Sequence, residues 1–373
     1  MDIEKGAVWI PFNTLERFMR EVFIRLGAPR ADAAICANVL IKADEFGFDS
    51  HGISRLKPIY YDRIRQGIQL AKTRVRVVRD SAGTAVLDGG NGMGHVVAHK
   101  AMALAIRKAR KHGLGMVAVR NSTHFGIAGY YPLMAVKAGM IGICGTNARP
   151  SIAPTFGVEN MLGTNPLTFA MPTGEKFPFL LDCATSIVQR GKVEIYAKLN
   201  KAMPKGWVIA HDGSSKTDPQ AVLAELIAGT AALLPLGGAG EEHAGYKGYG
   251  YATVVEILSA ALQQGAFLKM LGGVNRRGRK IPIPLGHFFL AIDIARFTPL
   301  ASFQRIARTI LRQLRASQKA PGQKRIYTAG EKEYLTWLAR KKKGAPVNRE
   351  TQKEILAMRA ELGLKKYQFP FER

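Results

Sequence analysis

The stretch Gly89-Gly90-Asn91-Gly92-Met93-Gly94 lies between a predicted strand, residues 84–87, and a predicted helix, residues 95–112. Glycine-rich turns of this kind bind phosphates in many α/β proteins, because the free N–H groups at the start of a helix attract anions. These glycines lack the G-x-G-x-x-G spacing of the common dinucleotide fold, and the chain has no GxxxxGK[ST] motif. The sequence therefore predicts a tight turn in an α/β protein that is not an ordinary Rossmann domain.

Short strands and longer helices alternate on both sides of this turn. Hydrophobic residues alternate or run together over a few positions in the strands, and recur at intervals of three and four in the helices. The sequence therefore predicts a central α/β region. Its strands are expected at residues 75–79, 84–87, 116–119, 140–144, 167–171, 177–182 and 287–292, and its helices at 95–112, 129–138, 187–199 and 248–264.

Both ends of the chain have helical patterns. Apolar residues recur at helical spacing between Phe12 and Leu26, and Gly27 ends the pattern. Further helices are predicted at residues 32–45, 54–65, 299–316, 331–343 and 349–362. We therefore divide the chain into an N-terminal helical segment (1–75), a central domain that would hold the cofactor site (76–295) and C-terminal helices (296–373).

The composition is that of a globular protein that does not cross a membrane. Hydrophobic residues make up 47% and charged residues 22% of the 373 residues. No apolar run approaches the ~20 residues that span a bilayer. Residues 1–20 carry charges throughout and lack the apolar core of a signal peptide. We therefore expect a cytoplasmic protein with no membrane partner.

An excess of basic residues is the unusual feature of the composition. Lys and Arg total 54 and Asp and Glu total 28, which gives a formal charge of +26. Such a charge favours acidic partners: nucleic acid, anionic lipid or a small anionic substrate. The basic runs at 276–280 and 340–343 come without a zinc motif or helix-turn-helix pattern. We therefore expect solvated basic faces, and a nucleic-acid-binding protein is only a distant alternative.

The loop at residues 47–52, between two predicted helices, carries the first candidate for chemistry, His51. Loops held between rigid elements often carry catalytic groups. Arg55 follows four residues later. An arginine can bind a carboxylate through two hydrogen bonds, and a histidine can transfer a proton near neutral pH. The pair is the minimum needed to bind a 2-oxo acid and protonate its carbonyl oxygen, although a histidine that only caps the loop would leave the same pattern.

Other polar segments follow predicted strands. His124 lies after the strand at 116–119, where side chains often face a ligand; a histidine that stabilises the turn is the alternative. Residues 182–186 precede a helix, so their hydroxyl and N–H groups could bind phosphate or only cap the helix. His95 and His99 have i, i+4 spacing but no evident third ligand, so no metal site is predicted.

Seven stretches in this order resemble one family, the malate/L-lactate dehydrogenases that are unrelated to the ordinary lactate and malate dehydrogenases. The family includes enzymes acting on malate, lactate, sulfolactate, ureidoglycolate, diketogulonate and a cyclic imino acid. The resemblance extends from about residue 10 to residue 364. The matching stretches are DSHGISRL (49–56), NSTHFGIAGYY (121–131), LGTNPLTFAMP (162–172), LLDCATSIVQRGK (180–192), LLPLGG (233–238), YKGYG (246–250) and GHFFLAID (286–293).

The resemblance implies a particular fold and assembly. It implies a mixed α/β fold of α+β character, with a non-Rossmann cofactor domain built on a largely antiparallel sheet. The helices from both chain ends would pack together as a second unit. The protein would be a homodimer with its active sites near the interface.

The resemblance also implies roles for individual residues. By similarity, His51 is the proton donor in reduction, although some relatives assign the acid/base role to the residue that matches His124. Arg55 would contact the substrate carboxylate, and Ser50 and Asn121 would line the same pocket. The cofactor, NAD or NADP, would be contacted by the stretches that contain Asp182, Ala184, Thr185, Ser186, Lys247, Gly248, Gly286 and His287.

The expected activity is reversible hydride transfer between NAD(P)H and a small anionic 2-oxo acid, which gives the 2-hydroxy acid. The alternative within the family is an NADPH-dependent reductase of a cyclic imino acid. The chain departs from the family at Thr123, where Asn is frequent, and at Cys183, where Met is usual. Ala148 and Arg149 follow Thr146-Asn147 where a small hydroxyl residue is common in the family, so a substrate contact there is open.

Overall fold

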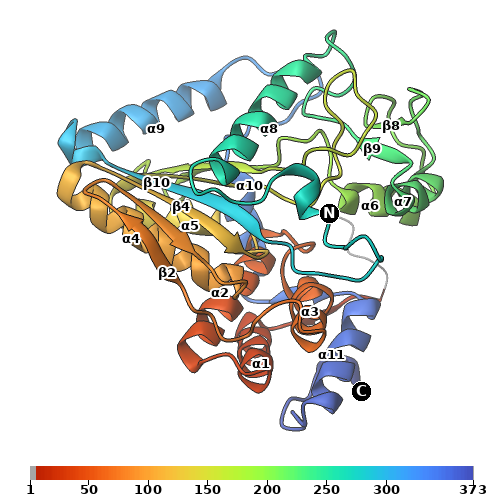
Figure 1. Cartoon of the computed structure of the whole chain (residues 1–373). Helices are drawn as coiled ribbons and strands as arrows, with labels where there is room; N and C mark the ends of the chain where they lie inside the picture. The colour runs from red at the N-terminus through yellow and green to blue at the C-terminus, as the bar shows by residue number, and fades with distance from the viewer. Residues whose placement is uncertain (1–5, 373) are drawn as a thin grey trace.

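A seven-stranded sheet forms the centre of the computed structural model, which describes residues 6–372 and, of residue 198, only the backbone (Figure 1). The strand order is β2-β3-β4-β10-β5-β6-β7, and every neighbouring pair is antiparallel except β3 and β4. This arrangement confirms the mixed α/β class with a largely antiparallel sheet. The strands are β2 Arg76–Asp80, β3 Thr84–Asp88, β4 Leu114–Ser122, β5 Met140–Thr146, β6 Leu167–Met171, β7 Phe179–Cys183 and β10 Leu285–Asp293.

Helices cover both faces of this sheet. Helices α4 (Gly94–His112) and α5 (Tyr130–Lys137) pack on one face, where their apolar sides share a core with alternate residues of β4, β5 and β10. Helix α8 (Gly245–Ala260) packs against β4, β5 and β10. It lies so close to β10 that a Cβ on Gly286 would come within 1.6 Å of the carbonyl oxygen of Ser259, which only glycine allows.

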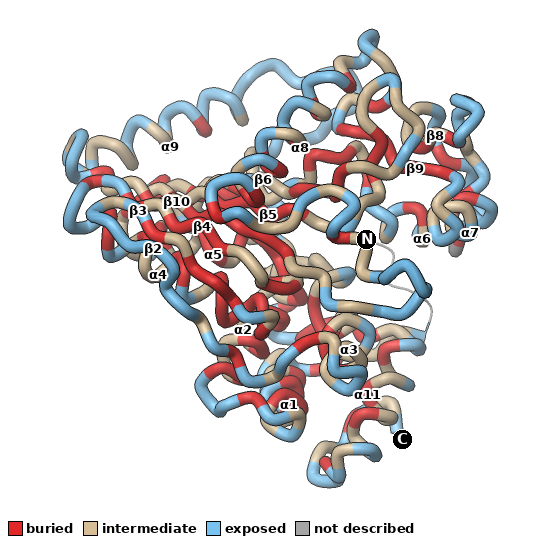
Figure 2. The backbone as a smooth tube through the Cα atoms, in the orientation of Figure 1, coloured by how far each residue is buried: buried red, intermediate tan, exposed pale blue. Residues whose placement is uncertain are grey.

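The two ends of the chain share a second hydrophobic core. Helices α1 (Phe12–Arg25) and α2 (Arg30–Phe46) pack together, and α10 (Glu331–Arg340) contacts α2. Residues of α11 (Arg349–Glu361) enter the same core. The sequence did not indicate the strands β1 (Val8–Ile10) and β11 (Ala345–Val347), which pair antiparallel and join the two ends. Figure 2 shows the buried backbone concentrated in this core and in the central sheet.

Helix α9 (Leu300–Ala316) stands apart from the helical core. It lies at the upper left of Figure 1, whereas α1 and α2 lie in the lower half, and Figure 2 shows it exposed along most of its length. Only Leu311 of this helix is buried. Among residues 6–372, no helix, α9 included, combines the length and the apolar character that a bilayer crossing requires.

A small third region follows β7. It contains α6 (Arg190–Lys198), α7 (Pro219–Ala228) and the strands β8 (Val208–Ala210) and β9 (Ala231–Leu233), around its own apolar cluster. The sequence did not lead us to predict α7. Its signals are nonetheless regular: Asp218 caps the first turn, a proline occupies the first helical position and Gly229 ends the helix with φ 78°.

The helix predicted at 54–65 is wrong in its geometry. The segment consists of a 3₁₀ turn (Ile53–Arg55), a π-helical turn (Leu56–Tyr61) and the short helix α3 (Asp62–Arg65). Pro58 lies inside the π-helical turn and has no N–H to donate. Such widened turns are frequent at functional sites, and this one carries Tyr60, which reaches the candidate site described next.

Candidate active site

A cavity of about 170 Å³ lies where the helical core meets the sheet. Its wall is formed by the loop after α2, the segment after β4, the end of β5 and the residues after it, the loop before β6, the end of β7 and the residues after it, and Leu285 of β10. Five of the thirteen candidate residues therefore come together here, although they are far apart in sequence: Ser50, His51, His124, Asp182 and Ala184. The lining residues are Phe48, Ser50, His51, His124, Phe125, Gly126, Ile127, Ala128, Thr146, Asn147, Ala148, Thr164, Pro166, Asp182, Cys183, Ala184, Gln189 and Leu285.

Hydrogen bonds to the carboxyl groups of Asp44 and Asp49 hold the loop that carries His51. Helix α2 ends at Gly47 in the left-handed conformation, which turns the chain sharply. The buried carboxyl of Asp44 accepts a hydrogen bond from the N–H of Ile53 (2.9 Å), and burial raises the pKa of this carboxyl well above its usual value. On the other side, Arg340 of α10 binds both carboxylate oxygens of Asp49. The C-terminal half of the chain thus holds the loop in position.

His51 faces the cavity with a neutral ring at pH 7. Its Nδ1 lies 2.8 Å from the hydroxyl of Ser50. Removal from water, and then the charge of Arg55, lower the pKa of His51 from 6.5 to about 4. The Nε of Arg55 donates to the carbonyl oxygen of Ser50, so the arginine stays beside the histidine.

His124 lies next to His51, with ring centroids 6.0 Å apart and ring planes inclined by 24°. Its Nδ1 lies 2.6 Å from the hydroxyl of Tyr60 and accepts the N–H of Gly126 at 3.3 Å. Burial lowers the pKa of His124 well below 6.5, and the charge of Arg63, or a proton on His51, lowers it further. The two imidazoles therefore form a neutral pair in surroundings of positive potential.

Arginines supply this potential. Arg55 and Arg63 lie close enough to lower the pKa of His124, and burial together with Arg149 lowers the pKa of the Arg63 guanidinium itself. Like charges repel one another, so an anion bound among them would be stabilised. Arg149 directly follows Ala148, which lines the cavity.

Asp182, at the end of β7, forms part of the wall of the cavity. Its carboxylate accepts the N–H of Gly129 (2.7 Å) at the start of α5 and the hydroxyl of Thr168 (3.1 Å). Burial raises the pKa of Asp182 to about 6 despite these hydrogen bonds. The neighbouring Cys183 is exposed at the end of β7 and lines the cavity.

The other residues expected at the cofactor are spread around this wall. Ala184 lines the cavity, while the Thr185 hydroxyl bonds to the backbone of Thr164 and Asn165. The Ser186 hydroxyl is buried and has no hydrogen-bond partner among the described residues. A second cavity of about 430 Å³ shares Ser50 and Gln189 with the first, and extends along α6 past Gly191 and Lys192.

The remaining candidates lie behind the cavity or away from it. The Nδ1 of His287 pairs with the Thr146 hydroxyl at 2.7 Å, and its ring stacks on Phe125. Gly286 donates its N–H to Asn147 (2.8 Å). Gly248 is packed against the backbone of Leu236. Lys247 is exposed at the start of α8.

The structure does not bring Asn121 to the cavity. It has φ 52°, and its amide donates to Asp88 at 3.0 Å, beneath the glycine turn. Conversely, sequence reasoning missed Tyr60 and Arg340, which act through neighbours distant in the chain. No local pattern distinguishes either residue from an ordinary helix residue.

Comparison with known proteins agrees with this geometry. The sequence profile of the malate/L-lactate dehydrogenase family matches residues 10–356. The chain belongs to the malate/L-lactate dehydrogenase family. It is 44% identical over 363 residues to a malate dehydrogenase of Pyrococcus abyssi (97% of each chain), and 37% identical over 349 residues to an L-sulfolactate dehydrogenase of Methanocaldococcus jannaschii (94% of this chain, 96% of that protein).

A solved structure supports the same assignment. The malate dehydrogenase of Entamoeba histolytica superposes with a TM-score of 0.93 at 41% identity, over 98% of this chain and 99% of the other. The predicted family is therefore confirmed. As a member of this dehydrogenase family, the protein has an oxo or hydroxy acid as its class of substrate and a nicotinamide as its class of cofactor.

Proposed function

We propose that the protein interconverts a small anionic 2-oxo acid and its 2-hydroxy acid, with NAD or NADP as the hydride carrier and His51 as the acid/base. The observation that carries this proposal is the pairing of His51 and His124, 6.0 Å apart in one cavity, beside Arg55. A histidine can exchange a proton with the substrate oxygen, while an arginine binds the carboxylate. When it is bound, the nicotinamide supplies the other half of the reaction, a hydride at C2.

His51 suits both directions of the reaction. With no ligand bound its pKa is about 4, so the neutral ring can accept the hydroxyl proton of a 2-hydroxy acid at pH 7. In the reverse direction, the carboxylate of a bound 2-oxo acid offsets the charge of Arg55 and raises the pKa of His51. The ring then takes up the proton that it gives to the carbonyl oxygen. Acid–base catalysis of this kind is worth roughly 10²–10⁴-fold in rate.

The arginines favour a substrate with two acid groups. Arg55 beside His51 would bind the carboxylate next to the reacting carbon. Arg63 and Arg149 influence each other electrostatically, so a second carboxylate or a sulfonate would relieve their repulsion. Malate and sulfolactate, the substrates named for the two relatives above, both fit this charge pattern.

The second cavity would take the rest of the cofactor. The first cavity, at about 170 Å³, is below the 300–1,000 Å³ typical of ligand sites, whereas the adjoining one has about 430 Å³. Helix α6 begins there with free N–H groups, beside Lys192, so a pyrophosphate would be stabilised. Ser186 directly precedes Ile187, which lines this cavity, and its buried hydroxyl has no hydrogen-bond partner among the described residues.

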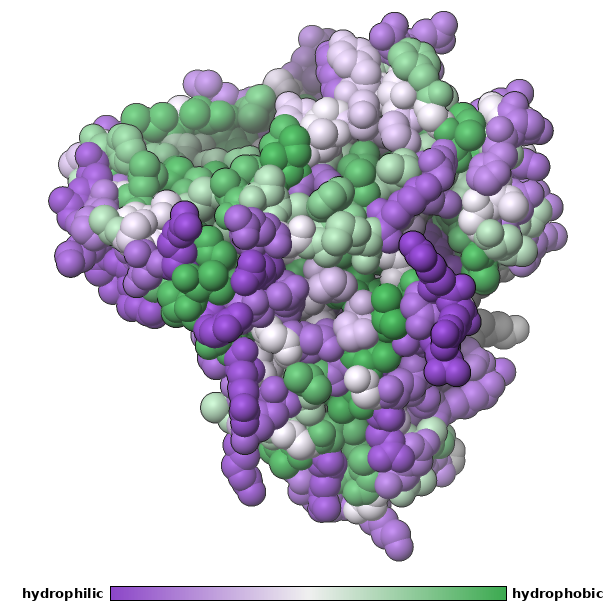
Figure 3. All heavy atoms as spheres, viewed as in Figure 1, coloured by the Kyte–Doolittle hydropathy of each residue, from purple (hydrophilic) through white to green (hydrophobic). Residues whose placement is uncertain are grey.

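We include a homodimer in the proposal because two helices expose apolar faces. On α9, Ile306, Ile310 and Leu314 are 52–56% exposed and lie four residues apart. Ile257 of α8 is 54% exposed, and apolar surface gathers over this part of the molecule at the upper left of Figure 3. Apolar patches of this kind mark protein interfaces.

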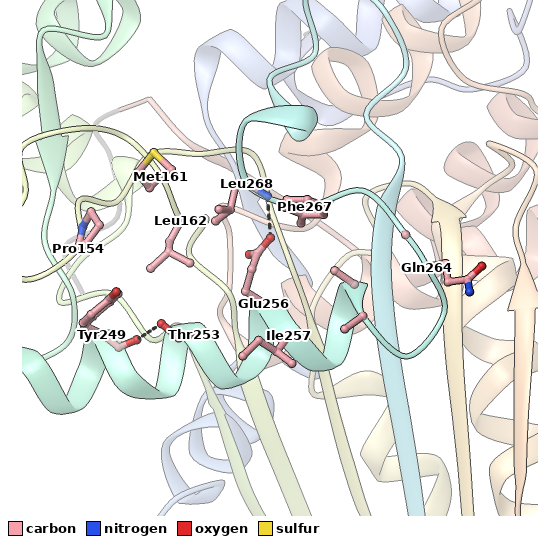
Figure 4. Close-up of a pocket in the computed structure, with 13 residues that line it drawn as sticks. Pro154, Met161, Leu162, Tyr249, Thr253, Glu256, Ile257, Gln264, Phe267 and Leu268 are labelled. Carbon is pink, nitrogen blue, oxygen red and sulfur yellow. Dashed lines mark hydrogen bonds between the residues drawn. The ribbon is translucent and has the colours of Figure 1, made fainter.

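A groove beside α8 adds to this surface. Tyr249, Thr253 and Ile257 of the helix line an apolar cavity of about 440 Å³ together with Leu162 and Phe267 (Figure 4). Glu256 is not free within it, because its carboxylate accepts the N–H of Leu268 at 2.9 Å. A second copy of the chain would remove this apolar surface from water.

A matrix of substrates and cofactors tests the activity. Oxaloacetate, sulfopyruvate, pyruvate and a cyclic imine carboxylate are each assayed with NADH and NADPH at the nicotinamide absorbance. We expect the largest kcat/KM for an oxo acid with two acid groups. Turnover of the cyclic imine alone would replace the proposal with the reductase, and no turnover of any substrate with either cofactor would reject it.

A further inference from the structure

Tyr60 connects the π-helical turn to the second histidine of the cavity. Its hydroxyl lies 2.6 Å from the Nδ1 of His124, and its fully buried ring packs 4.5 Å from the ring of His95. The turn that presents Tyr60 begins directly after Arg55. The same short segment thus carries the arginine beside His51 and the hydroxyl that reaches His124.

The hydrogen bonds of His124 determine which nitrogen carries its proton. The N–H of Gly126 can only donate, and it points to Nδ1 at 3.3 Å, so Nδ1 is an acceptor. Tyr60 must then donate its O–H to the same nitrogen. A neutral imidazole has one acceptor and one donor nitrogen. The proton of His124 therefore lies on Nε2, the nitrogen that remains for a ligand in the cavity.

The surroundings keep both partners in these protonation states. Burial raises the pKa of Tyr60 far above its usual value, so the phenol keeps the proton that it donates. The groups around His124 are His51, Arg63, His95 and Arg55: the two arginines disfavour a positive charge on its ring, and a proton on His51 or His95 would do the same. His95 is buried with both nitrogens unpartnered among the described residues, and burial lowers its pKa to about 3, so it offers no compensating charge.

We propose that Tyr60 is a positioning residue that holds His124 as a neutral imidazole with its proton on Nε2, so that His124 donates a hydrogen bond to the substrate oxygen while His51 transfers the proton. The inference rests on the proposed function for the identity of that oxygen. It divides the work between two adjacent histidines: His124 stabilises negative charge as it develops on the oxygen, and His51 is the acid/base. Because Nε2–H is a neutral donor, His124 needs no proton from solvent in the cycle.

The test combines a spectroscopic signature with kinetics. Histidine labelled with ¹⁵N distinguishes a protonated from an unprotonated ring nitrogen by NMR, and His124→Gln assigns the signal. In the wild type we expect a protonated Nε2 and an unprotonated Nδ1 at pH 7. In Tyr60→Phe, which keeps the ring and its packing, we expect a mixture of tautomers and a kcat about tenfold lower, with KM nearly unchanged.

Tyr130→Phe is the matched control. Its hydroxyl donates to Asn38 at 2.9 Å, outside the cavity, so its loss leaves both the His124 signal and kcat unchanged. A protonated Nδ1 in the wild type would overturn the proposal even if Tyr60→Phe did not fold. A folded Tyr60→Phe with wild-type kcat and wild-type tautomer would also overturn it. The expected tautomer in an inactive wild type would reject the proposed function but not the positioning.

Discussion

Arg340 binds Asp49 through both terminal nitrogens of its guanidinium, with one N–O distance of 2.9 Å, although the two residues are 291 positions apart. The same guanidinium donates to the carbonyl oxygen of Asp44 at 2.8 Å. Asp49 lies two residues before His51, so a helix near the C-terminus fixes the loop that carries the proposed acid/base. The joining of the two chain ends therefore serves the site as well as the core.

Replacement of Arg340 tests this link. We expect Arg340→Gln to cost ~1–3 kcal/mol of stability, because it removes a buried charged donor from a half-exposed carboxylate. Thermal unfolding should shift down by several degrees, and kcat should fall because the loop is no longer held. Lys342→Gln, a change at an exposed neighbour, serves as control. Equal melting temperature and kcat in Arg340→Gln and wild type would contradict the anchoring role.

The pH dependence of oxidation follows from the low pKa of His51. A neutral His51 accepts the proton of the hydroxy acid, so kcat/KM stays high near neutral pH and falls as the pH drops towards about 4. Arg55 contributes to the low pKa of His51. In Arg55→Gln the acidic limb of the pH profile, where kcat/KM falls, should therefore move to higher pH, and KM should rise. A limb that shifts to lower pH, or does not move, would show that Arg55 does not act on His51.

Arg149 should determine the preference for a second acid group. We expect Arg149→Gln to raise KM for an oxo acid with two acid groups about tenfold, since a charge-assisted hydrogen bond is worth ~1.5–3 kcal/mol when fully formed and less at an exposed residue. KM for pyruvate should change little. Arg107→Gln, on the exposed side of α4, is the control. Equal effects on both substrates would place the second acid group elsewhere.

The apolar face of α9 should be covered in the assembled protein. Ile310→Glu introduces a charge into the proposed interface, and we expect the mass in sedimentation to fall from two chains to one. Thr309→Glu places the same charge at the adjacent exposed position and should leave the dimer intact. A wild-type protein that sediments as a single chain would refute the dimer directly.

The sequence predicted the parts of the fold that depend on local patterns. All the predicted strands of the sheet exist, and the loop with His51 follows the predicted end of α2, although the helix predicted after it is wrong in its geometry. The sequence did not predict pairings between segments that are distant along the chain. The strands β1 and β11 are three residues each, too short for a periodic signal, and they are stable only as a pair between the chain ends.

The candidate site likewise contains residues that local patterns predicted and residues that they did not predict. His51, His124 and Asp182 were indicated by loops and strand ends, and the structure brings them into one cavity. Tyr60 and Arg340 acquire their roles only through tertiary contacts, so no local spacing could reveal them. Asn121 illustrates the opposite case, since the resemblance placed it in the substrate pocket at a strand end, yet Asp88 accepts its amide. A strand end predicts a position well, but it does not predict the direction of a side chain.

The transfer of deuterium from a labelled cofactor tests the central claim most directly. The oxo acid preferred in the substrate matrix is reduced with NADH or NADPH that carries deuterium at both C4 positions of the dihydronicotinamide, and the product is examined by mass spectrometry. We predict one deuterium at C2 of the hydroxy acid. In His51→Gln the rate should fall at least about 100-fold with the label at the same carbon, while His211→Gln, in an exposed loop, behaves as wild type. A product without deuterium at C2, or a His51→Gln enzyme at the wild-type rate, would contradict it.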